Sequence, residues 1–480
     1  MRRPAARSAL TVAALGSPTV LAFFSGGYFD APRLWATIVA WALVIVAAVA
    51  AMRPLPRSRA GIAALTGLVA LTGWTAASFA WAPAAAVVQT DLTRILLYAG
   101  VLIAARALLG HRATRRLTEP ALAGGTVVVV GYGLAERVLP GLLTFARSFT
   151  AGGRLEQPLT YWNAEGALAA MGLVLCARVA GDRTRSRPLR AAAAAANVIL
   201  GAGLYLSFSR GAIVAALAGL VALVGMRPTF SQIRAALLAA AVAVAAAVTV
   251  GVLPGVASLH GSLATREREG AIALALLVVL CAVGAAFTAW AVRAERSGHL
   301  RSASLPRPVR LRVASACAVP LLAVGLVLGA VGEHQDPHTY GANAARLTSI
   351  GSLRANYWAV AVQAFAHHPL DGLGSGGFRV AWLRERTVPV AALDAHSLEL
   401  QTAAELGVVG LAALAMLIGG VAFGARRGLR RDPELVAGWC AALVVWLLHS
   451  AIDWDWQMPA LTLLAVILGG AVLSAAEDVS

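Results

Sequence analysis

Residues 394–427 read DAHSLELQTAAELGVVGLAALAMLIGGVAFGARR, and this stretch decides the fold. It opens with polar residues around His396, continues as an apolar run over about 402–425, and ends at Arg426 and Arg427. A helix of about 20 apolar residues is long enough to cross the hydrocarbon core of a bilayer. The stretch therefore predicts a transmembrane helix with one basic end and one polar end that carries groups capable of chemistry.

Similar apolar runs recur along the chain, which is 59% hydrophobic, only 13% charged and has a mean hydropathy of +0.74. A soluble protein of 480 residues would carry far more charge. The pattern predicts an all-α, polytopic transmembrane helical bundle of about 12–14 helices, with residues 1–480 as a single membrane domain. The first run could be a signal peptide, but no small-residue cleavage site follows it, so we interpret it as a helix. The expected spans lie at about 9–27, 34–52, 60–82, 94–110, 121–139, 163–180, 190–208, 210–226, 234–253, 269–292, 313–332, 402–425, 434–452 and 458–476.

The distribution of arginine, which supplies all 40 basic residues, indicates the orientation of the chain. With the N-terminus in the cytoplasm, every predicted cytoplasmic loop is rich in arginine, as the positive-inside rule requires. We therefore expect a multi-pass protein of the cytoplasmic (inner) membrane with both termini in the cytoplasm. This distribution accounts for most of the net charge of +17, so we expect no nucleic-acid partner. The four cysteines lie within apolar runs and are interpreted as buried thiols rather than disulfides or metal ligands.

Residues 333–401 form the long connection before the last three predicted spans. We expect this segment to be an extracytoplasmic functional loop with helical parts, because a long polar loop usually carries function when the other connections of the protein are short. Arginines are disfavoured on the outer side of the membrane, so their accumulation there suggests an anionic partner. The alternative is a scatter of solvated arginines and contacts with lipid phosphates. The arginines predicted on this side include Arg147, Arg154, Arg210, Arg346, Arg354, Arg379, Arg384 and Arg386.

Two local patterns occur within this loop. Residues 352–366 repeat apolar side chains every four positions and predict a short helix on which Arg354 and Trp358 share a neighbouring face. Packing alone would explain Trp358 but not the arginine beside it. Gly372 and Gly374 begin a glycine-rich run that could expose backbone N–H groups to an anion, although a tight turn is the simpler interpretation. The run matches the spacing of a dinucleotide-binding motif, but no strand precedes it, so we reject that reading.

Several titratable groups border the last three spans. His396 follows Asp394 at a predicted membrane entry, and Glu405 lies about two to three helical turns into the span. We interpret His396 as a general base or a substrate ligand, with an ordinary packed or surface histidine as the alternative. His449 and Asp453 at the outer end of the following span could add a second polar cluster. Their spacing forms no tight metal-ligand set, and we expect neither a metal nor a cofactor.

Five short motifs occur in order along residues 145–460. They are Arg154 with Tyr161-Trp162-Asn163, then Ser209-Arg210-Gly211, Arg354-x-x-x-Trp358, Pro369-x-x-Gly372-x-Gly374, and Ala395-His396-Ser397 followed by Glu405-Leu406-Gly407 and Gly410. Together they resemble the O-antigen ligase and O-antigen polymerase-like superfamily. The resemblance implies a membrane glycosyltransferase that uses polyprenyl-diphosphate-linked glycans outside the cytoplasmic membrane, without a metal or a nucleotide sugar. Its implied partners are a lipid-linked oligosaccharide donor, a glycan or lipid-glycan acceptor, and membrane lipids.

The resemblance also assigns roles to individual residues. Arg210 and Arg354 match the arginines that hold the donor diphosphate, and His396 matches the histidine that acts on the acceptor hydroxyl. Ser397 departs from the family, which often has asparagine there, and fourteen spans exceed the usual number of about twelve, so ligase and polymerase activities both stay open. The complete predicted site comprises His396 as the catalytic residue, Arg210, Arg354, Arg154 and Arg346 as donor ligands, and Trp358, Gly372, Gly374, Glu405, His449 and Asp453 as supporting residues.

The residue types support the same chemistry independently of the resemblance. Guanidinium groups are permanently charged planar ligands for phosphate, and they accelerate transfer when they bind the leaving diphosphate more tightly in the transition state. The alternative function is a transporter or flippase for a lipid-linked or anionic substrate, which should carry ionisable groups near mid-membrane. The middles of the predicted spans are mostly Ala, Val, Leu and Gly, which favours the enzyme. A catalytically silent scaffold for glycan assembly is a third interpretation.

Overall fold

The computed structural model describes residues 2–50, 52, 54–300, 341–343, 347 and 353–477, with side chains from residue 7 onward. Within these residues the chain is helical and contains no strand. Alanine, leucine and valine dominate the sequence, and a helix satisfies every backbone polar group within its own segment, as a membrane requires. The helices are α1 (Arg2–Ala22), α2 (Asp30–Val49), α3 (Arg59–Ala77), α4 (Ala85–Leu108), α5 (Arg112–Val138), α6 (Trp162–Gly181), α7 (Arg187–Leu206), α8 (Arg210–Met226), α9 (Phe230–Gly251), α10 (Pro254–Ala257), α11 (Leu263–Arg296), α14 (Arg354–His367), α15 (Gly377–Glu385), α16 (Leu398–Arg431), α17 (Pro433–Ser450) and α18 (Pro459–Glu477).

Eleven of the described helices are long and apolar enough to cross a membrane, namely α2 to α7, α9, α11 and α16 to α18. The apolar helix α8 is shorter, at 17 residues. Every predicted span coincides with a described helix except the one expected at 313–332, which lies outside the described residues. The expectation of a multi-pass, all-helical membrane protein is therefore confirmed.

The centre of the bundle is α6, in which every residue after Trp162 is buried. Small residues let its neighbours approach closely. A Cβ added at Gly166 would lie 2.6 Å from Ser207 Oγ, and one at Gly172 would run into Thr126. Close approach through small residues is the usual way in which transmembrane helices pack. α6 therefore fixes the positions of the helices around it, which include α5, α7, α8 and α17.

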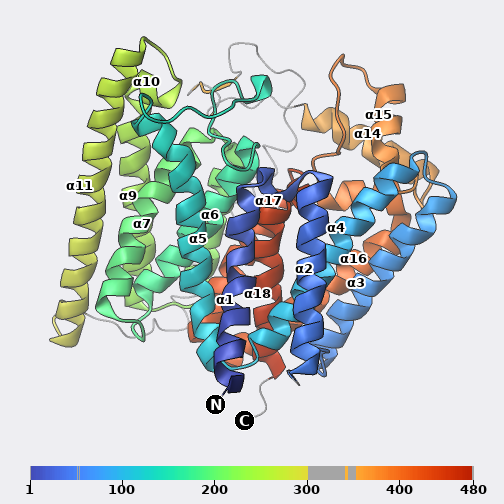
Figure 1. The fold of residues 1–480 in the computed structure, drawn as a ribbon, viewed down its shortest axis with the longest axis horizontal. Helices are drawn as coiled ribbons and strands as arrows, with labels where there is room; N and C mark the ends of the chain where they lie inside the picture. The colour runs from blue at the N-terminus through green and yellow to red at the C-terminus, as the bar shows by residue number, and fades with distance from the viewer. Residues whose placement is uncertain are drawn as a thin grey trace.

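The two ends of the bundle differ in what they carry. Figure 1 shows both chain termini at one end, which we call the termini end, and α14 and α15 at the opposite end, which we call the loop end. Since α18 runs from Pro459 toward the C-terminus, the connection between α17 and α18 also lies at the loop end. Residues far apart in the sequence are thereby brought together beside α14.

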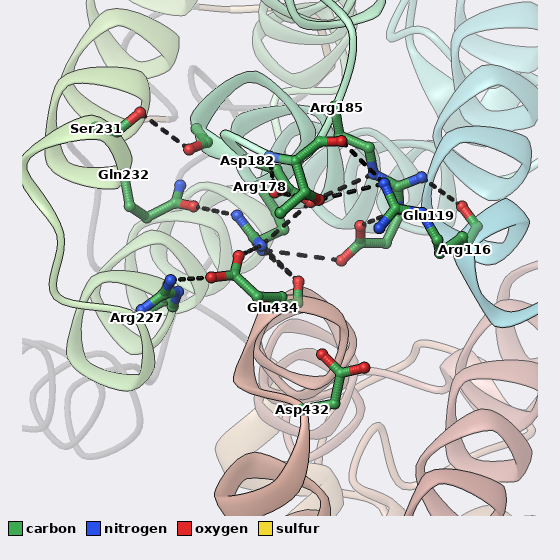
Figure 2. Close-up of polar contacts among 12 residues, drawn as sticks. Arg116, Glu119, Arg178, Asp182, Arg185, Arg227, Ser231, Gln232, Asp432 and Glu434 are labelled. Atoms are coloured by element: carbon green, nitrogen blue, oxygen red, sulfur yellow. Dashed lines mark hydrogen bonds and ion pairs between the residues drawn. The ribbon is translucent and has the colours of Figure 1, made fainter. Parts of the chain in front are cut away.

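A buried network of charges joins α6 to α17 at the termini end (Figure 2). Arg178, in the last turn of α6, donates to the Glu434 carbonyl at 2.5 Å, to the Glu434 carboxylate at 3.0 Å and to Gln232 Oε1 at 3.0 Å. Its guanidinium also lies 3.4 Å from the Asp182 carboxylate and 4.0 Å from that of Glu119. A buried arginine needs such partners, because an uncompensated charge is costly away from water.

At the loop end α16 is broken at Gly407, whose φ of +63° lies in the left-handed region that favours glycine. The chain before α15 packs against this break. The N–H groups of Leu373 and Gly374 donate to the carbonyls of Ala404 and Glu405, at 2.9 and 2.8 Å. The break therefore lets the loop join its backbone to that of α16, and it fixes the loop relative to the membrane helices.

Candidate functional site

The carboxylate of Asp453, in the α17–α18 connection, is the centre of the site at the loop end. Asp453 is fully buried and accepts hydrogen bonds from Arg354 Nη2 at 2.5 Å, the Tyr161 hydroxyl at 2.7 Å and Asn163 Nδ2 at 2.7 Å. We call these four residues the Asp453 cluster. Burial by itself would raise the pKa of Asp453, but Arg354 and the nearby histidines outweigh it and leave this pKa below its ordinary value. The cluster thus combines an anion with a cation that is partly exposed.

The position of Arg354 follows from the packing of α14. Tyr357 and Ala361 on one face of this helix are buried against Phe378 and Trp382 of α15. Arg354 stands at the first turn of α14, and 24% of its side chain is exposed even though it pairs with Asp453. The guanidinium is therefore held by the protein and is still partly exposed.

His396 lies beside this cluster with a defined ring orientation. Its ring stacks on Tyr357, with centroids 5.0 Å apart, and meets Trp454 edge-on at 6.5 Å. Its Nδ1 lies 3.0 Å from the carbonyl oxygen of Asp394. Because a carbonyl oxygen can only accept, Nδ1 carries the proton, and the neutral ring keeps its lone pair on Nε2. This is the tautomer that a general base acting through Nε2 requires.

The surroundings of His396 also decide its protonation. Burial lowers its pKa, Asp453 opposes that effect, and Arg354 reinforces it, with a net displacement below the ordinary imidazole value. The Trp358 indole donates to the His396 carbonyl at 3.4 Å. α14 consequently contacts the site through Arg354, Tyr357 and Trp358, two of which touch His396 itself.

A second series of buried polar side chains extends to the start of α8, at Arg210. His449 Nδ1 lies 2.6 Å from the Asp455 carboxylate, and His449 Nε2 lies 3.4 Å from Ser209 Oγ. Ser209 caps the first turn of α8 by accepting from the Ala212 N–H at 3.3 Å. These contacts hold the start of α8, where Arg210 is the first residue. Burial raises the pKa of Asp455, and His449 and the more distant Arg354 oppose that effect.

The remaining predicted residues have other surroundings. Arg154 is buried, donates to the carbonyls of Ala151 and Thr150 at 2.6 Å each, and stacks over Trp162 at 3.6 Å. These contacts brace the loop before α6, and none of them joins Arg154 to the Asp453 cluster. Arg346 lies outside the described residues. The donor-binding role of both arginines stays a prediction.

Gly372, Gly374 and Glu405 hold the loop before α15 against its neighbours. A Cβ on Gly372 would collide with the backbone of Glu405, and one on Gly374 would lie 2.5 Å from the backbone of Ala82. These positions require glycine because two backbones pass each other closely, which agrees with the simpler turn interpretation. The Glu405 carboxylate is buried and accepts from the Phe378 N–H at 3.3 Å. It belongs to the contact between α15 and α16.

Sequence reasoning did not single out Gln401, Gln457 or Trp454. Gln401 and Gln457 each donate to Asp394 Oδ1, at 3.0 and 2.9 Å, and Trp454 stacks on Tyr161 with centroids 4.1 Å apart. The spacing of Gln401 four residues before Glu405, on one helix face, was the available signal for Gln401. Among the described residues no group of three or more His, Cys, Asp or Glu side chains is arranged to hold a metal ion.

Residues 253–415 match the family described as O-antigen ligase. The matched range contains Arg354 and His396 and ends within α16, and it lies inside the range over which the sequence motifs resemble the same family. No curated protein matches the chain.

Proposed function

We propose that this chain, a membrane protein that carries an O-antigen ligase domain over residues 253–415, transfers a glycan from a polyprenyl-diphosphate-linked donor to an acceptor hydroxyl. The observation that supports this most directly is the convergence of Arg354 and His396 on Asp453. Arg354 is paired with Asp453 at 2.5 Å, and Asp453 is one of the charges that act on His396. A cation suited to phosphate and a neutral base are therefore both under the influence of one buried carboxylate.

In this proposal the donor diphosphate binds to Arg354 and Arg210. Asp453 holds the Arg354 guanidinium, 24% of the side chain stays exposed, and planar guanidinium groups bind phosphate oxygens in pairs. The side-chain contacts from Asp455 to His449 and from His449 to Ser209 fix the start of α8 and, with it, the backbone of Arg210. Preorganised charges of this kind need no rearrangement when negative charge develops on the leaving diphosphate.

The transfer step then uses His396 Nε2 as the base. The acceptor oxygen forms a bond to the anomeric carbon while the bond from that carbon to the diphosphate oxygen breaks, and the electron pair leaves with the diphosphate. The proton of the acceptor hydroxyl passes to Nε2. The pKa of His396 is lowered by burial, so the ring is neutral and ready to accept this proton at neutral pH.

We further propose that the loop end, with residues 333–401, faces the outside of the cytoplasmic membrane and that both termini face the cytoplasm. The arginine-rich loops at the termini end support this orientation through the positive-inside rule. A lipid-linked donor in the outer leaflet would then reach Arg354 directly.

The experiment that tests this function begins with the glycolipid that accumulates when the gene is deleted. The purified full-length protein in nanodiscs is incubated with the lipid extract and the envelope fraction of the deletion strain. We expect release of polyprenyl diphosphate together with covalent attachment of the glycan to envelope material, both detected by mass spectrometry. If the protein instead moves the intact glycolipid between leaflets of a proteoliposome without releasing diphosphate, it is a flippase and the proposal is wrong.

A further inference from the structure

Gln401, on the first turn of α16, makes two hydrogen bonds to the segment that carries His396. Its Oε1 accepts from the Ala395 N–H at 2.9 Å, and its Nε2 donates to Asp394 Oδ1 at 3.0 Å. Gln457, from the turn before α18, donates to the same Asp394 oxygen at 2.9 Å. We call Gln401, Gln457 and Asp394 the Gln401 clamp. All three side chains are buried, so each of these hydrogen bonds replaces one that water would otherwise provide.

The segment held by the clamp has a backbone conformation that needs support. His396 has a φ of +54°, which lies in the left-handed region that residues other than glycine adopt at a cost. The same conformation brings its Nδ1 to the Asp394 carbonyl at 3.0 Å and so fixes the tautomer. Without external contacts, the segment would relax toward an extended conformation and the ring would leave its place between Tyr357 and Trp454. Gln401 opposes this relaxation with two hydrogen bonds, beside one from Gln457 and the contacts of His396 with Tyr357 and Trp358.

We propose that Gln401 is a positioning residue for glycan transfer, because its amide holds residues 394–396 in the conformation that presents His396 Nε2 to the acceptor hydroxyl. The inference rests on the proposed function of His396 and adds a residue that neither the family match nor the motifs assign. In the described part of the chain, the side-chain hydrogen bonds of Gln401 go to Ala395, Asp394 and Glu405. None of them reaches His396 Nε2 or the Asp453 cluster. Its effect must therefore pass through the backbone and the carboxylate of Asp394.

The charged groups around the clamp determine what a substitution does. Asp91 and Arg94 of α4 act electrostatically on Asp394, as His396 does, and Gln401 also lies 3.4 Å from the Glu405 carboxylate. His396 itself faces Arg354 of α14 and Asp453. Gln401→Glu keeps the acceptor for the Ala395 N–H but replaces the amide donor by a carboxylate that repels Asp394. The added negative charge also favours the imidazolium form of His396 and raises its pKa.

The test compares three variants of the full-length protein in nanodiscs with the accumulated glycolipid as donor. For Gln401→Glu we expect kcat to fall about 10- to 100-fold with an unchanged dissociation constant for the donor, and the acid limb of the pH profile to move to higher pH. In the double variant Gln401→Glu/Asp394→Asn, the amide at position 394 donates to the carboxylate at position 401, which reverses the direction of the wild-type hydrogen bond. The net charge of the pair then equals that of the wild type. This double variant should recover much of the lost kcat and return the acid limb. Gln363→Glu, an exposed position on α14, is the matched control and should change neither quantity.

Each outcome separates this inference from the proposed function. An active wild type with an unaltered Gln401→Glu variant would remove Gln401 as a positioning residue and leave the function standing. A loss of kcat that the double variant does not recover, with no movement of the acid limb, would mean that Gln401 supports the fold alone. A wild type without transfer activity would overturn the proposed function itself.

Discussion

Arg354 at the start of α14 and Asp453 in the α17–α18 connection form an ion pair in which Nη2 and Oδ2 lie 2.5 Å apart. The two partners are unequal, because Asp453 is fully buried whereas 24% of the Arg354 side chain is exposed. The buried partner thus anchors a cation that remains accessible. This arrangement differs from a surface ion pair, which contributes little and organises little.

The first prediction concerns the shape of the cation at positions 354 and 210. Arg→Lys at either position keeps the charge but loses the planar fork, so donor affinity or turnover should fall about 10- to 100-fold, as expected for the loss of one charge-assisted hydrogen bond. Arg384→Lys, on the exposed surface of α15, is the matched control. Binding of the polyprenyl-diphosphate glycan to each purified variant measures the effect. Full affinity and full turnover in both the Arg354 and Arg210 variants would rule out diphosphate binding by these side chains.

The second prediction concerns pH. His396 must be neutral to accept a proton, and burial lowers its pKa below the ordinary value of about 6.5. Activity should therefore persist as the pH falls through 6.5 and should be lost only below the lowered pKa of His396. Initial rates between pH 4.5 and 8, with protein integrity checked at each pH, give the profile. An acid limb centred above the imidazole reference would mean that Asp453 and Asp394, rather than burial, dominate the charge state of His396.

The third prediction concerns orientation. Cysteine introduced at the exposed position Glu385 at the loop end should react with an impermeant thiol reagent on intact cells. Cysteine at the exposed position Ser186, between α6 and α7 at the termini end, should react only after the cells are opened. The wild-type protein supplies the background from its own cysteines. The reverse pattern of labelling would place the site in the cytoplasm and exclude the proposed side of action.

The fourth prediction concerns the network in Figure 2. Arg178→Ala removes the buried guanidinium that lies between Glu119, Asp182 and Glu434 and leaves Arg185 as the cation beside Glu119 and Asp182. Removing one partner from a buried charge network should cost about 3–5 kcal/mol of stability. A lower Tm in detergent and a weaker yield are expected. Because Arg178 lies at the opposite end of α6 from Tyr161, the folded fraction should still bind the donor. The exposed residue Arg183 provides the control through Arg183→Ala, and an equal Tm for both variants would contradict the assigned role of Arg178.

The sequence predicted the helices and indicated Arg354 and His396 as candidate site residues, because both inferences depend on local patterns. Apolar runs identify spans directly, and Arg354 and His396 stood out as polar groups that the membrane-spanning pattern did not explain. Arg178 illustrates what local patterns miss. From the sequence it is one more arginine at the cytoplasmic end of the span expected at 163–180, yet it pairs with Glu434, 256 positions away in the chain.

Gln401 and the glycines show the same limit in two other ways. Nothing in the sequence around Gln401 indicates that the preceding loop folds back onto its amide, because that contact depends on a backbone conformation at His396 that few residues adopt. For Gly372 a turn could be predicted from residue type. The requirement for glycine comes instead from the backbone of Glu405, which lies against Gly372 close to the break of α16 at Gly407.

The central claim is that His396 is the base in glycan transfer, and His396→Ala tests it most directly. Donor binding and transfer are measured separately on the purified protein in nanodiscs, with the glycolipid that accumulates in the deletion strain. Transfer should fall roughly 10²–10⁴-fold, the usual contribution of a general base, whereas donor affinity should be unchanged because the arginines carry it. Unchanged transfer would remove His396 from the mechanism, and a parallel loss of binding and transfer would make it a residue that holds the substrate.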